Sequence, residues 1–525
     1  MHAVNLSAKQ KAHEFLNQAD YFNLGHILTE QAHPKTTLLS ELVIDSIPDA
    51  IELLKEIDLD ALKTFSTYID GITHLQQAIQ QTFADGGRVF LCGCGATGRL
   101  ALYLEYLWRT LKNDDRVIAF MAGGDIALVH SLEGFEDFPE YGAMHLQQLG
   151  FSQNDLLISC TEGGETPFVI GATERAAKLS KYPCYFLYCN PDEQLQKITR
   201  CKQILANNRV IKLNLTVGPM ALAGSTRMQA STVLQLAVGM ALFIDAQNMQ
   251  AEFSKFYSFA MHNNFEFLSD FIYKEAECYI AGDYITYLID DYGITTLTDL
   301  TERSPTFSLQ PIDNLQGQPK HHSLYYFAQD NTSHSLDAWQ KLLGRKPRFL
   351  DWPRVHHKTR SDYLFSFDFS LNAINKRKQM LPQSSHHLFE IRKYREELVW
   401  HFGKYRHALD ISGLIPLFEH TFLKMLLNIH STLTMGRLHR YRHNLMTYVK
   451  PTNGKLIDRA ARYIIWLLKI DADKDFSYED VIYEIFYQSD RLSEDDSIVM
   501  RVYNQLKNKK GGRLHRTNTT LRGKT

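Results

Sequence analysis

The sequence lacks the features that mark several large protein classes. Its seven cysteines, at positions 92, 94, 160, 184, 189, 201 and 278, are odd in number and unevenly spaced, unlike a disulfide framework. No apolar run is long enough to span a bilayer, and the first residues, MHAVNLSAKQKAHEF, lack the apolar core of a signal peptide. The formal net charge is only -2. We therefore expect a cytoplasmic protein with reduced thiols and no nucleic-acid or membrane partner.

Metal-binding patterns are missing as well. Cys92 and Cys94 form a C-x-C pair, but no second cysteine or histidine pair stands at zinc spacing from it. His439 and His443 are at helical spacing, but the surrounding stretch RLHRYRHN is cationic and disfavours a divalent ion. We expect no metal site and no cofactor.

The chain does have length and a regular alternation of apolar runs. Its 525 residues predict two to four domains. Between about residues 70 and 245, helix-length segments separate the runs RVFLCG, RVIAFMAG, DLLISC, CYFLYCN and VIKLNL, which predicts an α/β domain with a parallel sheet. A weaker pattern begins near residue 278. There YITYLI, GITTLTDL and SLYYFAQDN are expected strands, and SLDAWQKLL is an expected helix. Helical regions are expected at 389–446 and 478–506.

The stretch CGCGATGRL (92–100) follows the first run and contains G-x-G-x-x-G. A strand, a glycine turn and a helix N-terminus bind the phosphate of a dinucleotide or of a sugar. A dinucleotide site needs an acidic residue at the end of the second strand, but that strand ends in small residues and Asp125 comes only after them. The nicotinamide interpretation is therefore disfavoured.

Hydroxyl groups follow the later strands instead. ISCTEGGETP (158–167) offers Ser159, Thr161 and Thr166, and GSTRMQAST (224–232) offers a second cluster with Arg227. Hydroxyls, backbone amides and one cation suit a sugar phosphate, although each cluster alone could equally cap a helix. Because these two clusters and the glycine loop follow three of the expected strands, we expect a small anionic sugar as the ligand.

Four motifs in this order resemble the N-acetylmuramic acid 6-phosphate etherase and glucokinase regulatory protein family. They are LTEQAHPKTTLL (28–39), CGCGATGRL (92–100), AGGDIALVHSLEGFED (122–137) and GSTRMQAST (224–232). DLTERSPTF (299–307) and TNGKLIDRA (452–460) extend the resemblance. It implies two SIS domains in tandem, each a flavodoxin-like α/β fold with a parallel sheet, and a C-terminal helical lid.

The resemblance also implies a domain layout. The expected parts are an N-terminal helical segment (1–70), a first SIS domain with the phosphosugar loop (71–260), a second SIS domain with a degenerate loop (261–445), the helical lid (446–508) and a basic disordered tail (509–525). Because both SIS domains stand in one chain, we expect a monomer through internal pairing.

The resemblance further implies the site residues. The first half keeps the glycine loop but has Leu107 at the position of a catalytic glutamate, whereas the second half has LIDDYGI (288–294) in place of the loop but holds Glu302. Glu136 and Glu302 match the family's catalytic pair. The phosphosugar ligands implied are Gly95, Thr97, Gly98, Thr161, Glu133, Thr226 and Arg227, with Lys455 and Arg459 from the lid.

Three functions fit these residues. The first is a sensor of a hexose phosphate that controls a sugar kinase, as in the glucokinase regulatory protein. The second is a lyase that releases lactate from N-acetylmuramic acid 6-phosphate, and the third is a noncatalytic phosphosugar-binding scaffold. The tandem layout, the lid and the departures from the etherase pattern at Ala96, Met220 and Gln229 narrowly favour the sensor.

Two glutamates oppose a phosphate at the expected site. Glu162 and Glu165 stand in the loop that should face it. A like charge at about 5 Å costs roughly 3 kcal/mol at an effective dielectric near 20. We expect these side chains to point away or to be offset by Lys455 and Arg459.

Overall fold

The computed structural model describes residues 7–130, 132, 134–317, 319–353, 355–451, 453–493 and 496–509, without the side chains of His356 and His357. The chain divides into two compact units. The larger comprises residues 27–304 and 309–444, and the smaller comprises residues 1–26, 305–308 and 445–525. Apart from Lys509, the expected disordered tail lies outside the described residues.

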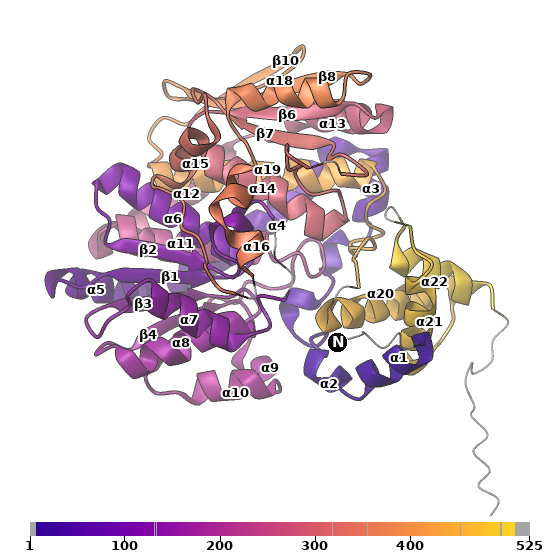
Figure 1. Ribbon diagram of the computed structural model, residues 1–525, viewed down its shortest axis with the longest axis horizontal. Coiled ribbons are helices and arrows are strands. Elements are labelled where there is room, and N and C mark those ends of the chain that lie inside the picture. The colour runs from indigo at the N-terminus through magenta and orange to yellow at the C-terminus, as the bar shows by residue number, and fades with distance from the viewer. Residues whose placement is uncertain are drawn as a thin grey trace, which may run out of the picture. The chain divides into compact units, whose positions relative to one another are not determined.

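The first half of the larger unit is built around a five-stranded parallel sheet (Figure 1). Its strands are β1 (Val89–Gly93), β2 (Val117–Met121), β3 (Leu156–Cys160), β4 (Cys184–Tyr188) and β5 (Val210–Asn214). Their order, β2-β1-β3-β4-β5, is the expected flavodoxin-like order. All residues of β1, β3 and β4 are buried, as in a sheet covered on both faces. The five strands predicted for the first half are confirmed.

Helices alternate with these strands and cover the sheet. They are α5 (Ile69–Ala84), α6 (Ala96–Lys112), α7 (Pro139–Gln148), α8 (Pro167–Leu179), α9 (Asp192–Leu195), α10 (Thr199–Ala206) and α11 (Gln229–Phe243), with the short 3-10 helix η4 (Asp125–Leu128) after β2. Helix α7 packs against α8, and α11 packs against α5 and α6. Right-handed crossovers place these two groups on opposite faces of the sheet. Because the strands are parallel, the glycine turn after β1 and the hydroxyl cluster after β3 follow strand ends at the same edge of the sheet, whereas the cluster at 224–232 leads into α11.

The second sheet is mixed. Its strands are β6 (Tyr284–Ile289), β7 (Tyr325–Gln329), β8 (His386–Tyr394), β9 (Glu397–Phe402) and β10 (Tyr405–Asp410), in the order β10-β9-β8-β6-β7. Strand β6 is parallel to β7 and β8, whereas β8, β9 and β10 are antiparallel. The expected all-parallel sheet is wrong for this half. Arg395 and Gly403, with φ of 56° and 62°, form the tight turns that only antiparallel neighbours can use.

Two segments of the second half differ from the predicted secondary structure. The expected helix at 389–446 is strand up to Asp410, and helix only in α19 (Pro416–Arg437). Buried Phe389 and Ile391 alternate there with more exposed residues, which is the two-residue period of a strand. The expected strand at 293–300 belongs to α14 (Gly293–Phe307), because tertiary packing outweighs the strand preference of its threonines. The strand predicted at β7 and the helix predicted at α15 (Ser335–Leu343) are confirmed.

Helix α19 is buried over nearly its whole length. The remaining helices belong to both units. In the larger unit they are η1 (Leu28–Glu30), η2 (Pro34–Thr36), α3 (Leu39–Asp45), α4 (Ile47–Phe65), η3 (Ser66–Tyr68), η5 (Ala246–Asn248), α12 (Met249–His262), α13 (Leu268–Ala281), α16 (His356–Thr359), α17 (Ser361–Phe365) and α18 (Leu371–Met380). Helix α19 packs against α3, α4, α11 and α13. The smaller unit holds α1 (Ala8–Leu16), α2 (Ala19–Phe22), α20 (Gly454–Ala472), α21 (Tyr478–Ser489) and α22 (Ile498–Lys507). Among the described residues, no helix combines the length and apolarity needed to cross a membrane.

Candidate phosphosugar site

The turn between β1 and α6 has the geometry of a phosphate-binding loop. Gly95 precedes the helix with a φ of 54°, and a Cβ built on it meets nothing within 4 Å. On Gly93 a Cβ would lie 2.4 Å from the carbonyl carbon of Thr97, and on Gly98 it would lie 2.5 Å from the Cβ of Met121. The loop is thus close-packed at its base and open at Gly95, where the amides of the helix N-terminus are suited to an anion.

The two threonines expected to hold the phosphate are buried near strand ends. Thr97 Oγ1 accepts from the backbone N–H of Cys94 at 3.0 Å and donates to its carbonyl at 2.8 Å. Thr161 Oγ1 lies 3.0 Å from Thr166 Oγ1, just before α8. Thr97 is 1% exposed and Thr161 is 0% exposed. The Thr97 hydroxyl thus bonds to the backbone of the glycine loop at Cys94 and leaves the space at Gly95 open.

Glu136 reaches the glycine loop from the segment after η4. Its Oε2 accepts a hydrogen bond from Cys94 Sγ at 3.4 Å, and its backbone carbonyl accepts from the N–H of Phe168 at 3.0 Å. The second contact fixes this segment to the first turn of α8. The expected catalytic Glu136 therefore lies beside the loop. Glu133, expected nearby, lies outside the described residues.

Glu302 comes from α14 in the second half, yet it meets the helix that follows the glycine loop. Arg99, one turn into α6, donates from Nη1 to Glu302 Oε1. Its Nε and Nη2 donate to the carbonyls of Leu128 and Ala127 at 3.3 and 2.8 Å. The Arg99 side chain is 0% exposed and that of Glu302 is 12% exposed. Both expected catalytic carboxylates thus contact residues at or just beyond the same loop, Cys94 and Arg99.

Arg227 bonds to the second half of the larger unit. Its Nη1 lies 2.8 Å from Asp299 Oδ1, and its Nη2 donates to Ser431 Oγ and Thr432 Oγ1 at 3.2 and 3.0 Å. Burial alone would raise the pKa of Asp299, but Arg227 and Arg303 outweigh it and lower that pKa. The observed contacts of Arg227 join the two halves. Thr226, expected beside it as a ligand, is half-buried.

A neighbouring arginine compensates one of the two negative charges in the loop after β3. Glu165 Oε2 pairs with Arg200 Nη2, and Arg200 Nε also donates to the Glu165 carbonyl at 2.8 Å. Glu162 is 8% exposed. For Glu165 the offsetting cation is therefore Arg200, a residue of α10 that was not among the expected partners.

Comparison with known proteins places this chain among proteins that share the glycine-loop domain. Residues 71–177 match the family model of the glucokinase regulatory protein N-terminal SIS domain. The N-acetylmuramic acid 6-phosphate etherase of Prochlorococcus marinus (strain MIT 9303) is 33% identical over 227 residues, which cover 43% of this chain and 67% of the etherase. This chain belongs to the N-acetylmuramic acid 6-phosphate etherase family.

Other members show a similar extent of likeness. N-acetylmuramic acid 6-phosphate etherase 2 of Vibrio cholerae serotype O1 (strain ATCC 39315 / El Tor Inaba N16961) is 32% identical over 226 residues, covering 43% of this chain and 69% of its own. A crystal structure of tagatose-6-phosphate ketose/aldose isomerase from Escherichia coli covers 76% of this chain and 97% of its own, at 11% identity and a TM-score of 0.41, too low to carry an argument. The matched region spans about two thirds of the length of the etherases.

The acidic residue after β2 is bound by two arginines, which does not suit the ribose-binding role of a dinucleotide site. Asp125 accepts from Arg345 Nη1 and Nη2 at 2.6 and 3.0 Å and from the backbone N–H of Arg348 at 2.7 Å. Both arginines also pair with Glu105 of α6. The carboxylate that could hold a ribose is thus bound to the second half of the chain.

Sequence reasoning missed Arg99 and Arg345 as members of these contacts. Arg99 carried a usable signal, because a charged side chain in the apolar run that follows the loop must find a buried partner. Nothing local could identify that partner, since Glu302 stands 203 residues away. Arg345 lies in a segment without any recognised motif.

The two lid residues implied by the family resemblance, Lys455 and Arg459, lie on α20 of the smaller unit. Lys455 is half-buried and Arg459 is 8% exposed. Their role toward a phosphosugar stays a prediction.

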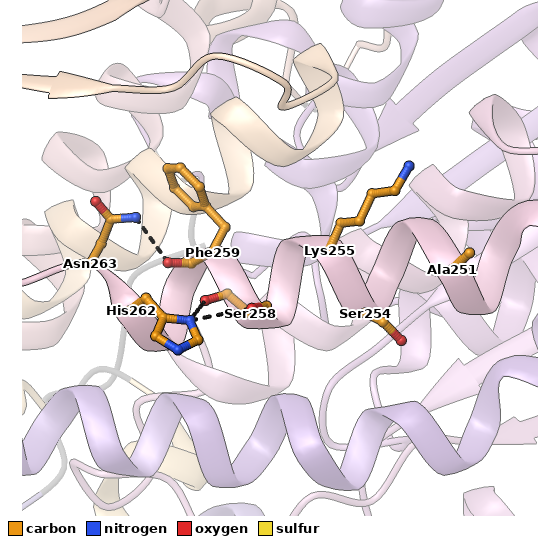
Figure 2. Close-up of a pocket in the computed structure, with 7 residues that line it drawn as sticks. All are labelled: Ala251, Ser254, Lys255, Ser258, Phe259, His262 and Asn263. Atoms are coloured by element: carbon orange, nitrogen blue, oxygen red, sulfur yellow. Dashed lines mark hydrogen bonds between the residues drawn. The ribbon is translucent and has the colours of Figure 1, made fainter.

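A pocket along α12 contains none of the expected site residues (Figure 2). Its lining comprises Ala251, Ser254, Lys255, Ser258, Phe259, His262 and Asn263. Within it, His262 Nδ1 lies 2.7 Å from the carbonyl of Ser258 and Asn263 Nδ2 donates to that of Phe259 at 2.9 Å, so these polar groups bond within their own helix. We assign no ligand to it.

Proposed function

We propose that this chain binds N-acetylmuramic acid 6-phosphate at the glycine loop and releases lactate from it, as an etherase-type carbon–oxygen lyase. The observation that carries the proposal is the contact of Glu302 with Arg99. It brings a carboxylate of the second half to the helix that begins at the phosphate loop, where Glu136 also lies. The names of the relatives, which are etherases, support the same activity.

The reaction needs two proton-transfer groups. One group takes the proton from carbon 2 of the sugar while the bond from carbon 3 to the lactate oxygen breaks, and another gives a proton to the departing oxygen. Water then adds to the resulting double bond and restores the hydroxyl at carbon 3. Two carboxyl groups in different surroundings suit this work. We assign the two roles to Glu136 and Glu302 as a pair.

The phosphate would rest on the amides near Gly95 and Gly98, with Thr161 and Thr226 as hydroxyl partners. Arg99 and Arg227 are each bound to a carboxylate, which lowers the net charge that they offer to an anion. We propose that Lys455 and Arg459 supply the further positive charge, as the family likeness implies. Alanine at either position is expected to weaken phosphosugar binding.

A sugar-phosphate sensor is the second candidate. The sequence narrowly favoured it, and the match of residues 71–177 to the glucokinase regulatory protein domain supports it. The lyase now ranks first because the curated relatives that match over a longer stretch bear the etherase name. The contacts of Arg99 and Arg227 between the halves also suit a monomer, which light scattering would test.

The deciding experiment measures lactate released from N-acetylmuramic acid 6-phosphate by the native protein and by Glu302→Gln and Glu136→Gln. We expect each variant to lose about 10²–10⁴-fold in kcat. The exposed Glu140 on α7 provides the matched control, and Glu140→Gln should keep native turnover.

Binding is measured in parallel, so that turnover and ligand recognition are separated. Titration calorimetry with the same phosphosugar reports affinity, and circular dichroism reports folding. A folded protein that binds the phosphosugar but releases no lactate would overturn the lyase. The sensor would then be tested through sugar-phosphate-dependent association with a hexose kinase.

A further inference from the structure

Three metal-ligating side chains converge outside the phosphosugar site. Cys278 stands in the last turn of α13, Asp283 in the turn that leads into β6, and His387 near the start of β8. One ligand atom from each lies within 4.8 Å of the other two. His387 Nε2 and Asp283 Oδ2 are 2.9 Å apart. The sequence shows no such motif, because residue 387 is more than 100 positions from the other two.

Backbone hydrogen bonds hold the three ligands in place. The N–H of Asp283 donates to the carbonyl of Cys278 at 2.9 Å, across a turn in which Gly282 has a φ of 75°. Strand β8 pairs in parallel with β6, with His387 opposite Ile285, which sets the histidine beside the start of β6. The ligand set is therefore positioned by a helix end and two paired strands rather than by a loose loop. Figure 1 shows α13, β6 and β8 side by side at the second sheet.

We propose that Cys278, Asp283 and His387 bind a zinc ion, or a divalent ion of similar chemistry, that links α13 to the second sheet. Sulfur, imidazole nitrogen and carboxylate oxygen are the ligand types that zinc accepts together, whereas magnesium and calcium prefer oxygen alone. A thiolate and a carboxylate also balance the charge of a divalent ion.

Two of the three ligand side chains are partly exposed to solvent, so the ion can enter and a water molecule can serve as the fourth ligand. The thiol of Cys278 is buried, but the side chains of Asp283 and His387 are 24% and 30% exposed, so water completes the coordination from the solvent side. Burial raises the pKa of Cys278, an effect that nearby Lys274 opposes. Zinc binds cysteine as the thiolate, so binding displaces the thiol proton of this residue.

The test uses the full chain freed of metal by a chelator and then titrated with zinc against a chromophoric competitor. We expect one equivalent to bind tightly. Cys278→Ser and His387→Gln should each weaken binding at least about tenfold, in the range found for the loss of metal-site contacts. The adjacent His386, whose Nε2 lies 3.0 Å from the Leu381 carbonyl, gives the matched control, and His386→Gln should bind as the native chain does.

Cobalt(II) provides a second measurement that does not depend on affinity. A thiolate-to-cobalt absorption band is expected in the native chain and in His386→Gln, and its absence is expected in Cys278→Ser. Failure of the native chain to bind one equivalent of zinc, a band that persists in Cys278→Ser, or equal losses in His386→Gln and His387→Gln would each overturn the proposal. None of these readouts depends on lactate release, so the zinc site is tested independently of the proposed activity.

Discussion

The two strand-to-helix turns, one at each sheet, differ in what fills them. In the turn from β1 to α6, Gly95 has a positive φ and faces open space. In the turn from β6 to α14, a Cβ on Gly293 would lie 2.1 Å from Gln329 Oε1. Gln329 Nε2 donates to the carbonyls of Ile289 and Asp290 at 3.1 and 2.6 Å. The first turn is open to a ligand, and the second is closed by the chain's own side chain.

The two turns also differ in charge, and this difference again favours a ligand at the first turn. The second turn carries Asp290, which pairs with Lys341, and Asp291, whose pKa is raised by burial and then by Asp290. The first turn carries no charged residue between Gly93 and Gly98. Two carboxylates repel a phosphate, so one turn is suited to bind it and the other is not. The second half instead places Glu302 against Arg99, in the helix that follows the first turn.

The largest expected effect lies at the joint between the two halves of the larger unit, by which we mean Asp299 with Arg227 and Arg303. Asp299 of α14 is shared by the buried guanidinium groups of Arg227 and Arg303. Asp299→Asn removes that charge and leaves both cations with less compensation. Breaking a buried ion pair in this way costs about 3–5 kcal/mol, and urea unfolding should show a loss of that size.

The second turn supplies the control for the joint. Asp290 and Lys341 form a pair whose side chains are 32% and 34% exposed. Asp290→Asn should cost no more than about 1 kcal/mol, as is usual for exposed pairs. Equal losses in Asp290→Asn and Asp299→Asn would mean that the joint does not hold the two halves together.

The open turn predicts a defect in ligand binding when Gly95 becomes alanine. The backbone of Gly95, with φ of 54° and ψ of -124°, is one that L-residues rarely adopt, at a cost of about 1–3 kcal/mol, so it should relax away from its native path. We expect calorimetry to show about tenfold weaker binding of N-acetylmuramic acid 6-phosphate. Gly150, which follows α7, likewise has a positive φ, of 75°, and open space at its Cβ. Gly150→Ala should lose similar stability and keep native affinity for the phosphosugar. An equal loss of affinity in Gly150→Ala would contradict the assignment of the ligand to the first turn.

The first sheet could be predicted from the sequence because its strands are short apolar runs bounded by turn residues. The second sheet was harder, since Phe389, Ile391, Trp400 and Phe402 face inward at every second position among charged residues. That two-residue period is typical of a strand, so the predicted helix is wrong there, as is the strand predicted over the threonines of α14.

The site could be predicted only in its local parts. The glycine loop and Glu136 belong to motifs, whereas the Arg99–Glu302 and Arg227–Asp299 contacts depend on how the halves pack. Such contacts join residues whose separation in sequence gives no pattern. The closure of the second turn by Gln329 is of the same kind.

Acid should destabilise both regions through one buried histidine in each. Burial lowers the pKa of His145 in the first half to about 4, and burial with Lys393 lowers that of His420 in the second half to about 3. An unfolded chain takes up these protons near pH 6.5, so stability is present above that pH and is lost as the pH falls. At pH 5 each histidine should account for about 2 kcal/mol of the loss.

His420→Gln tests this pH dependence while keeping a polar partner for Thr295, whose Oγ1 lies 2.7 Å from the ring Nδ1. The free energy of unfolding of this variant should fall less between pH 7 and pH 5 than that of the native chain. His145→Phe should flatten the same curve by a similar amount. An unchanged pH dependence of unfolding in both variants would contradict the prediction. It would show that these imidazoles take up protons equally in the folded and the unfolded chain, or that other groups govern acid unfolding.

The smallest expected effect concerns Cys94, which links the open turn to Glu136. Its thiol is a weak donor, and a hydrogen bond of this kind contributes about 0.5–1.5 kcal/mol. Cys94→Ala should therefore lower kcat/KM for lactate release by about two- to tenfold, whereas Cys94→Ser keeps a donor and should stay closer to native.

The neighbouring Cys92, buried within β1, separates a local effect on Glu136 from a general loss of packing. Cys92→Ala should lower stability and leave kcat/KM of the folded protein unchanged. If Cys94→Ala is instead as active as the native chain, the backbone contact of Glu136 with Phe168 is sufficient to position its carboxylate. The first turn would then act in phosphate binding alone, and segments outside it would position the carboxylates of Glu136 and Glu302.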